Sequence, residues 1–228
     1  MSAFFEPPPP PPDEPQHSPA PWFAPPAGTL PGVAALELVL AHTDRVAIYI
    51  ARLLGYPTGF GFDVMVIAAP AGQDEQLDMG AALFGHHRRG HHRQLDPLDP
   101  ERLRLGVQFS DGQKATNIGT FDDTEDQPSG PVMHAVGGSG SDREYHQEQW
   151  VWPLPPPGRL SFVCEWPAAG IELTRHEIDA QDVLDAAGRA QTLFPDPSPG
   201  RGGAPPSVVS YGLSQVATSK PKRPDSSA

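Results

Sequence analysis

The 228-residue sequence is poor in cysteine, lysine and asparagine: it has one cysteine, Cys164, three lysines and one asparagine, Asn117. A single cysteine excludes an internal disulfide, so packing and hydrogen bonds must hold the fold. No apolar run approaches the roughly 20 residues that span a bilayer, and the N-terminus lacks the basic start and apolar stretch of a secretory signal. These absences predict a cytoplasmic protein without membrane contact.

Basic side chains are also scarce relative to acidic ones. Residues 33–194 contain 23 aspartates and glutamates against 12 lysines and arginines, and the formal net charge of the whole chain is -12. Non-specific binding to nucleic acid depends on cations that neutralise phosphates. The charge balance therefore argues against a nucleic-acid partner.

Proline is unevenly distributed and marks the ends of the chain. Twelve of the 30 prolines lie in residues 1–32 and seven lie in residues 195–228. The run Pro7–Pro12 has no amide donors for a helix or a sheet, so it should extend as polyproline II. The C-terminal segment has too few apolar side chains to offset the entropy of ordering it. We therefore expect a disordered proline-rich arm over 1–32, one folded domain over 33–194 and a disordered tail over 195–228.

The middle of the chain alternates between apolar and polar side chains with a period of two, which is typical of antiparallel strands with one buried face. The alternation is cleanest in LRLGVQF at 103–109 and in RLSFVCEW at 159–166. Asp111-Gly112 is a strong hairpin signal after the first of these segments. Further strands are predicted at 36–40, 46–54, 60–66, 132–136 and 147–152. About eight such strands predict a mainly β fold, an antiparallel β-sandwich that is immunoglobulin-like in general architecture.

One segment near the end of the domain has helical periodicity instead. Apolar side chains recur at helical spacing from Ala180 to Phe194, Asp179 is placed to cap the first turn, and Pro195 ends the pattern. We expect one C-terminal amphipathic helix over 179–194 that packs on the sandwich or over one of its open edges.

The segment GHHRRGHHR at 85–93 is the most obvious candidate for a metal site, because its imidazoles lie within a few residues of one another. The candidate ligands are His86, His87, His91 and His92. Three arginines in the same segment would repel a cation, and its composition is typical of a solvated insertion between two strands. We interpret residues 70–100 as such an insertion, with weak metal affinity, and we assign no cofactor to the protein.

Three further patterns suggest chemistry but lack the context that it requires. Cys164 with His176 or His146 would form a nucleophile and base pair, but the alternation places Cys164 among core residues. The glycine-rich GGSGSD at 137–142 has no lysine at the phosphate-loop spacing and is better explained as a hairpin connection. The carboxylates near the end of the domain single out no acid and base pair; they are Glu165, Glu172, Glu177 and Asp179.

The segment WVWPLPPPG at 150–158 places two tryptophans on one face of a strand that the following prolines must end. Large aromatic side chains at such positions are usually buried, so core packing is one interpretation of Trp150 and Trp152. If they are exposed, they form a contact surface for a partner. We therefore name both as candidate interaction residues.

Four segments carry a resemblance to other proteins: MSAFFEPPPPPP at the start, YPTGF at 56–60, LRLGVQFSDG at 103–112 and WVWPLPPPGRLSFVCEWPAAGIE at 150–172. In these motifs, and in most of residues 1–194, the chain resembles a family of uncharacterised proteins of GC-rich actinobacteria. The excess of arginine over lysine, 13 to three, is the bias that a GC-rich genome imposes. The resemblance implies no activity, substrate or site residue.

These observations rank three functions. A non-catalytic binding or interaction module comes first, with a protein partner at the proline-rich arm or at a face of the sandwich. The alternative is a hydrolase with carboxylates and histidines on loops, zinc-dependent or not, and a pocket that gathers histidines with Glu172 or Glu177 would favour it. The histidines in question are His134, His146 and His176. A small-ligand or carbohydrate-binding protein is third, and exposed tryptophans would favour it.

Overall fold

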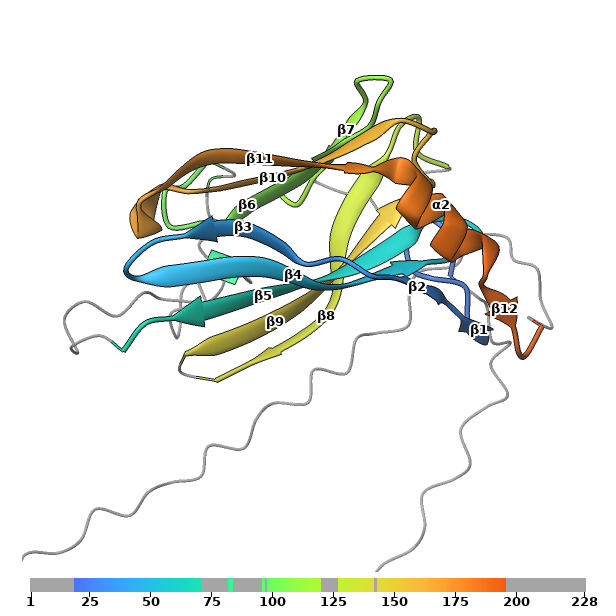
Figure 1. The fold of residues 1–228 in the computed structure, drawn as a ribbon, viewed down its shortest axis with the longest axis horizontal. Helices are drawn as coiled ribbons and strands as arrows, with labels where there is room; N and C mark the ends of the chain where they lie inside the picture. The colour runs from blue at the N-terminus through green and yellow to red at the C-terminus, as the bar shows by residue number, and fades with distance from the viewer. Residues whose placement is uncertain are drawn as a thin grey trace, which may run out of the picture.

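The alternating segments of the sequence form the strands of two antiparallel sheets that pack face to face. The structure is a computed structural model, and it describes residues 19–70, 82–83, 96, 98–119, 127–141 and 143–195. Figure 1 shows the two layers, with the larger sheet below the smaller one. The prediction of a mainly β protein with antiparallel sheets is confirmed, and the layers are consistent with a β-sandwich. No helix within the described ranges is long and apolar enough to cross a membrane.

The larger sheet has six strands, two of which pair with different parts of the same neighbouring strand. Its strands are β2 (Gly32–Ala34), β3 (Leu38–His42), β4 (Val46–Gly55), β5 (Phe60–Ala68), β8 (Val132–Gly140) and β9 (Glu144–Trp152). The order is β2-β4-β5-β9-β8, and β3 also pairs with β4. β2 pairs with residues 53–55 of β4, whereas β3 pairs with residues 47–50.

The smaller sheet has four strands, of which one is absent from the sequence prediction. Its strands are β6 (Arg104–Gln108), β7 (Lys114–Thr116), β10 (Arg159–Trp166) and β11 (Ile171–Asp179), in the order β11-β10-β6-β7. Gly112 has φ 87° in the turn between β6 and β7, which confirms the predicted hairpin. The short 3-10 helix η1 (Pro167–Ala169) joins β10 to β11. The sequence prediction misses β11 because this edge strand carries polar side chains on both faces, Glu172 and Arg175 among them.

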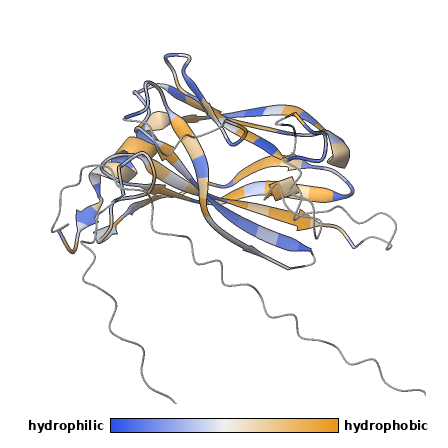
Figure 2. Ribbon diagram, turned by 180° about the vertical axis from the view of Figure 1, so that it is seen from behind, coloured by the Kyte–Doolittle hydropathy of each residue, from blue (hydrophilic) through white to orange (hydrophobic). Residues whose placement is uncertain are grey.

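The core lies between the two sheets and is built from their inward-facing apolar side chains. Phe62 of β5 and Phe162 of β10 meet edge to face across it, with ring centroids 5.2 Å apart. Trp166 is also fully buried, and its indole N–H donates a hydrogen bond to the Glu101 carbonyl at 3.0 Å. Figure 2 shows the apolar and polar residues that alternate along the strands. Burial of these side chains is the main force that holds the layers together.

Two glutamines lie in this core and connect β9 to part of the predicted insertion. The Gln149 amide donates to Oε1 of Gln147 at 2.7 Å, and the Gln147 amide donates to the Leu83 carbonyl at 3.0 Å. Leu83 and its neighbour Ala82 are themselves buried. The prediction of a solvated insertion over 70–100 is therefore wrong at these two residues, whose apolar side chains supply contacts inside the sandwich.

Helix α2 (Ala180–Gly188) covers one end of the sandwich (Figure 1). Asp179 caps it, because the carboxylate accepts a hydrogen bond from the Gln181 amide at 2.9 Å. The predicted continuation to residue 194 is wrong, since the helix ends at Gly188, a residue with low helix propensity. Strand β12 (Gln191–Thr192) follows and pairs with β1 (Thr29–Leu30). Phe194, which the helical pattern includes, is 74% exposed.

The helix approaches the larger sheet at a notch formed by two glycines. Gly32 of β2 and Gly55 of β4 are partners in the antiparallel register. A Cβ atom at Gly32 would lie 1.9 Å from the Ala186 carbonyl oxygen, and one at Gly55 would lie 2.2 Å from the Ala187 amide nitrogen. The notch therefore brings the helix backbone into direct contact with the sheet backbone.

Residues 19–23 pack on the outer face of the larger sheet, and we call them the N-terminal strap. Phe23 is buried, the indole N–H of Trp150 donates to the Pro21 carbonyl at 3.0 Å, and Nε2 of His134 lies 2.7 Å from the Phe23 carbonyl oxygen. The sequence prediction assigns this segment to a disordered arm over 1–32, and the packing of residues 19–32 contradicts that assignment. Residues 1–18 and 196–228 lie outside the described residues.

Candidate functional site

The histidine-rich segment at 85–93 is the predicted candidate for a metal site. His86, His87, His91 and His92 lie outside the described residues, so weak metal affinity of this segment stays a prediction. In the glycine-rich segment, Gly137–Gly140 belong to β8, and the turn to β9 follows. The Ser141 amide donates to the Glu144 carbonyl at 2.7 Å in this turn. The segment therefore makes a hairpin connection, as predicted, although the turn comes after the glycines.

The two candidate interaction tryptophans lie on the outer face of the larger sheet, not in the sandwich core. Trp150 is fully buried beneath the N-terminal strap and Tyr56, whose ring centroid is 5.4 Å from its own. Trp152 is half-buried, lies edge to face with Trp22 at 5.9 Å, and lines a pocket of about 420 Å³ with several prolines. An exposed contact surface that includes Trp150 is therefore not formed.

Cys164 is a buried thiol without nucleophilic character. Its side chain is fully buried on β10. Burial, with a smaller contribution from the neighbouring Glu165 carboxylate, raises the pKa of Cys164 to about 12. A thiol with such a pKa stays protonated at neutral pH, which confirms the prediction of an inert core cysteine.

The fold separates two of the three histidines from the carboxylates predicted for a loop-borne hydrolase site, and the third lies on a strand. His134 and His146 lie in the larger sheet, whereas Glu172 and Glu177 lie in the smaller one. His176 places Nε2 at 2.9 Å from the Leu40 carbonyl oxygen and so connects β11 to β3 across the edge of the sandwich. These histidines lie beside backbone carbonyls or strand carboxylates, and a loop pocket does not gather them with the two glutamates.

The outer face of the smaller sheet carries a groove of about 260 Å³, which we call the outer groove. Its apolar lining includes Leu98, Gly106, Ile118, Val163 and Leu173. Leu98 and Leu173 are 63% and 64% exposed, so the groove presents two large apolar side chains to solvent. A Cβ at Gly106 would lie 3.2 Å from Thr116 Cγ2, so the absence of a side chain there keeps the floor open.

Polar side chains surround this apolar floor. Arg104 forms an ion pair with Glu165 and also donates to the Leu98 carbonyl at 2.9 Å. Arg175 donates to the side-chain oxygen of Gln108 at 2.7 Å, and Lys114 is exposed at the other side of the groove. Three cations and one carboxylate thus line the groove, although the chain as a whole is acidic.

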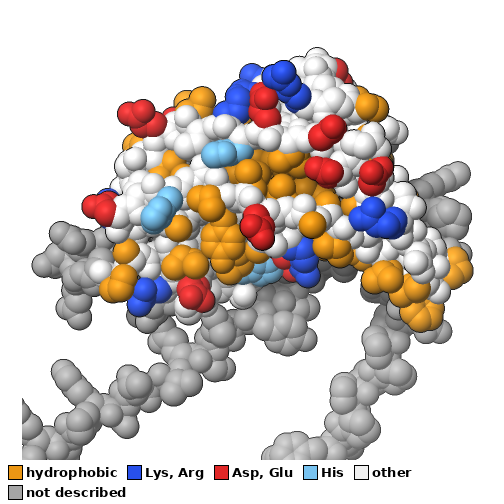
Figure 3. Space-filling model, viewed as in Figure 1, with side chains coloured by type: hydrophobic (Ala, Val, Ile, Leu, Met, Phe, Trp, Pro, Cys, Tyr) orange, Lys and Arg blue, Asp and Glu red, His pale blue; other side chains and the backbone are white. Residues whose placement is uncertain are grey.

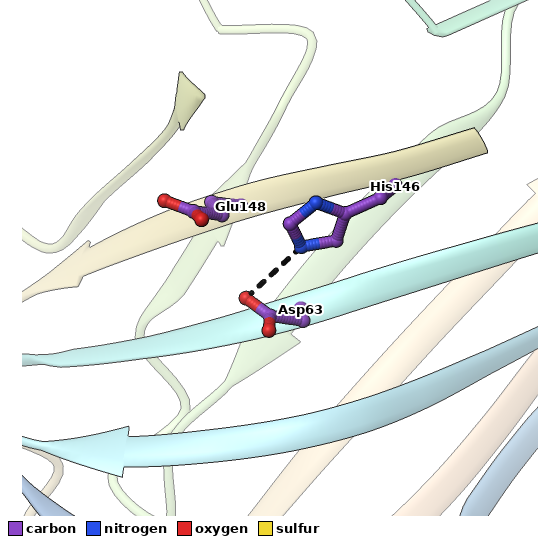
Figure 4. A group of neighbouring side chains, drawn as sticks. All are labelled: Asp63, His146 and Glu148. Carbon is purple, nitrogen blue, oxygen red and sulfur yellow. Dashed lines mark ion pairs between the residues drawn. The ribbon is translucent and has the colours of Figure 1, made fainter. Parts of the chain in front are cut away.

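A second cluster of charged side chains lies on the outer face of the larger sheet. Arg52, Asp63, His146 and Glu148 form this group, which we call the charged cluster. Arg52 Nε is 2.7 Å from Asp63 Oδ2, and His146 Nε2 is 3.4 Å from Asp63 Oδ1. Figure 4 shows the imidazole directed at the Asp63 carboxylate, with Glu148 beside it on the same strand as His146. The ligand atoms of Asp63, His146 and Glu148 all lie within 4.8 Å of one another.

The electrostatics of the charged cluster follow from its position on the sheet. Asp63 and Glu148 are direct partners in the register of β5 and β9, where like charges repel. The Asp63 side chain is only 11% exposed, so water screens this repulsion poorly, and Arg52 and His146 offset it. Burial raises the pKa of the nearby Tyr56 hydroxyl above its ordinary value; the smaller effects of Arg52, which lowers it, and of the two carboxylates, which raise it, oppose each other.

Apolar side chains also gather at the end of the molecule where β1 and β12 pair (Figure 3). Leu30, Leu193 and Phe194 are 50%, 55% and 74% exposed there.

The sequence indicates His146 as a candidate residue but does not indicate the charged cluster as a unit. The spacing of His146 and Glu148 on a predicted strand indicates that the two side chains share a face. Asp63 is the only charged residue of its strand, and it faces away from the apolar side. Nothing in the sequence shows that β5 and β9 are neighbours in this register, and only that pairing brings Asp63 opposite Glu148.

Comparison of the chain with models of protein families, with curated proteins and with solved structures finds no match. The assignment of a function therefore depends on the geometry of these two surfaces.

Proposed function

We propose that the protein is a non-catalytic binding module whose outer groove binds an extended, acidic peptide segment of a protein partner. A locally cationic, apolar groove on an acidic chain is the observation that carries this proposal. Arg104, Lys114 and Arg175 line the groove, whereas the net charge of the chain is -12. Such a charge distribution attracts an acidic ligand to the groove and repels it from the rest of the surface.

The dimensions of the groove favour a peptide over a small molecule. Its volume of about 260 Å³ is below the ~300–1,000 Å³ of pockets that enclose a small ligand. An extended peptide needs less depth, because its alternate side chains point to opposite faces. Apolar side chains of the peptide would contact Leu98 and Leu173, and its carboxylates would reach the surrounding cations.

The alternatives have less support from the same geometry. A hydrolase would need a loop pocket that gathers histidines and glutamates, but His134 and His146 lie on a different sheet from Glu172 and Glu177. A carbohydrate or small-ligand carrier would need exposed tryptophans, but Trp150 is buried, and the pocket beside Trp152 is wide and formed mainly by loop residues.

Two finer points belong to the same proposal. We place the module in the cytoplasm, where its lone thiol, Cys164, would stay reduced. We also propose that the sheets act as an immunoglobulin-like scaffold, in which a rigid sandwich presents one face to its partner.

Selection of random linear peptides displayed on phage, with the full-length chain as bait, tests the proposal. We expect the enriched peptides to carry net negative charge with apolar side chains at alternate positions. The double variant Lys114→Glu, Arg175→Glu should bind them about tenfold more weakly or worse, because it reverses two charges of the groove. High salt should weaken binding to the wild-type chain.

Arg159→Glu is the matched control, since Arg159 is an exposed cation of the same sheet outside the groove. It should leave peptide affinity unchanged. Deletion of residues 1–18 should also have no effect, and a loss of binding on that deletion would move the site to the proline-rich arm. Enrichment of basic peptides, or an equal loss in Arg159→Glu, would contradict the proposal.

A further inference from the structure

We propose that Asp63, His146 and Glu148 form a binding site for one divalent transition metal ion, with zinc as the best-fitting common ion. This inference goes beyond the proposed function and does not depend on it. The site lies on the larger sheet, whereas the outer groove lies on the smaller one.

Two adjacent strands hold the three ligands in place. His146 and Glu148 are two residues apart on β9 and share a face, and Asp63 of β5 is the register partner of Glu148. The pairing of β5 with β9 runs from Phe60 to Ile67 without an irregularity. Ligands on paired strands are positioned more accurately than ligands on loops, so little entropy is lost when they bind an ion.

One pair of ligand atoms already has the separation that a small tetrahedral ion requires. His146 Nε2 and Asp63 Oδ1 are 3.4 Å apart, and two ligands bonded at ~2.0–2.1 Å to a tetrahedral ion are separated by about 3.3–3.4 Å. The same 3.4 Å is long for a hydrogen bond, for which N···O is about 2.7–3.2 Å. Glu148 has a half-exposed side chain, so its carboxylate can rotate toward the ion without disturbing the core.

The two carboxylates of the cluster repel each other, and a bound cation would stabilise them. Two carboxylates face each other directly across β5 and β9, and one of them is largely buried. Arg52 supplies the positive charge in the structure, with Nε at 2.7 Å from Asp63 and Nη2 at 3.9 Å from Glu148. Its side chain is 48% exposed, so it can withdraw into solvent when an ion enters. Arg52 therefore competes with the metal for the same carboxylates.

The donor set indicates which ions bind. An imidazole nitrogen favours zinc and its neighbours in the first transition row over magnesium and calcium. Three protein ligands leave one position of a tetrahedral ion open to water or to a ligand atom of another molecule. The site is thus of the open kind, not the closed four-ligand kind that only supports a fold.

Metal binding by the histidine-rich segment has to be removed before the metal affinity of the charged cluster can be measured. The parent for the test is the full-length chain with four substitutions: His86→Gln, His87→Gln, His91→Gln and His92→Gln. Titration with Co²⁺, followed by visible absorption, reports tetrahedral binding, and calorimetry with Zn²⁺ reports stoichiometry. We expect one equivalent of cobalt with tetrahedral absorption bands, displaced by one equivalent of zinc.

Substitutions in the charged cluster should move the affinity in opposite directions. His146→Gln and Glu148→Gln should each weaken zinc binding by more than about tenfold, since even residues that only orient a metal ligand contribute that much. Arg52→Gln should strengthen it by about threefold, because it removes a half-exposed competing cation. His42→Gln is the matched control, an exposed histidine on β3 of the same sheet, and it should leave the affinity unchanged.

Three outcomes would overturn the assignment. They are the absence of cobalt bands in the parent, a His146→Gln variant that binds zinc as tightly as its parent, and an Arg52→Gln variant that stays folded but binds zinc more weakly. His146 and Glu148 are partly exposed, so their variants should fold, whereas Asp63 variants would leave Arg52 without its buried partner. Peptide binding by the His146→Gln variant, measured in parallel, separates failure of this site from failure of the outer groove.

Discussion

The two sheets of the sandwich present outer faces of opposite character. The N-terminal strap covers part of the outer face of the larger sheet, with Trp150 buried beneath it and the charged cluster alongside. The smaller sheet has no such cover among the described residues, and it exposes Leu98 and Leu173 in the outer groove. Both faces belong to antiparallel strands whose other side lies in the same core. The strand structure alone therefore does not determine whether an outer face is covered or exposed.

The difference shows how a sheet face becomes either structural or available for binding. A tryptophan on the larger sheet is accommodated because the strap buries its ring and the Pro21 carbonyl accepts its N–H. Leucines on the smaller sheet have no polar atom to satisfy, so they can stay exposed at small cost. We therefore expect substitutions beneath the strap to change stability and substitutions in the outer groove to change peptide binding.

The largest expected effect is that of Trp150→Ala. The substitution removes a fully buried ring, its contact with Tyr56 and its hydrogen bond to the strap. We expect the free energy of unfolding, measured by urea denaturation, to fall by about 3–5 kcal/mol. Trp152→Ala, at a half-buried ring two residues away, should cost clearly less. Equal losses in the two variants would mean that the strap does not distinguish the rings.

Removal of the strap should have the next largest effect. Deletion of residues 1–23 exposes Trp150 and eliminates the burial of Ala20 and Phe23. We expect a loss of about 2–3 kcal/mol in the free energy of unfolding, from apolar area and two hydrogen bonds, with a red shift of tryptophan fluorescence. Deletion of residues 1–18 keeps the strap and should cost nothing. A similar loss from the shorter deletion would assign the stabilisation to the proline run instead.

A smaller, pH-dependent effect is expected at the same face. Burial lowers the pKa of His134 below its ordinary value, and the hydrogen bond to the Phe23 carbonyl opposes this only in part. Below an unfolded-state pKa of about 6.5, the unfolded chain therefore binds more protons at this residue than the folded chain does. Stability from His134 should be complete above that pH and should fall as the pH drops toward the lowered folded-state pKa.

The comparison of wild type with His134→Gln isolates this effect, because the substitution changes only this imidazole. The glutamine keeps an N–H donor for the Phe23 carbonyl but does not titrate. We expect the loss of stability between neutral and mildly acidic pH, measured by urea denaturation, to be smaller in the variant. An identical pH dependence would show that His134 does not anchor the strap in its neutral form.

The smallest effect should come from the open face. Leu173→Ala removes an exposed side chain and should change the free energy of unfolding by no more than about 0.5 kcal/mol. The same variant should lose affinity for the acidic peptides that the outer groove selects. A large loss of stability instead would indicate that Leu173 packs against residues of the folded body.

The strands that the sequence predicts are those with one apolar and one polar face, such as β6 and β10. Their period of two is a direct record of burial on one side. β11 escapes this test because it lies at the edge of its sheet, where Glu172 and Arg175 remain in solvent. The alternation pattern does not predict the strap either, since its proline-rich composition resembles that of a disordered arm. Its position depends on packing against the ring of Trp150.

The candidate surfaces could be anticipated less well than the strands. His146 and Glu148 are two residues apart, so their shared face follows from the sequence, but Asp63 joins them only through the register of β5 and β9. The outer groove depends on the order of four strands, which brings Val163 of β10 between Gly106 of β6 and Arg175 of β11. Strand order and register arise from the whole core, and a local pattern does not contain them.

The two-glycine notch under α2 also bears on how the chain finds its correct pairing. Gly32 and Gly55 leave room for Ala186 only when β2 and β4 adopt their observed register. A slip of two residues would keep the faces of the strands but would place Ala34 opposite Gly55, and its methyl group would enter the space that the helix backbone needs. Packing of α2 on the sheet thus favours the correct register of β2 with β4, because the helix cannot pack against a sheet in which these strands are misaligned.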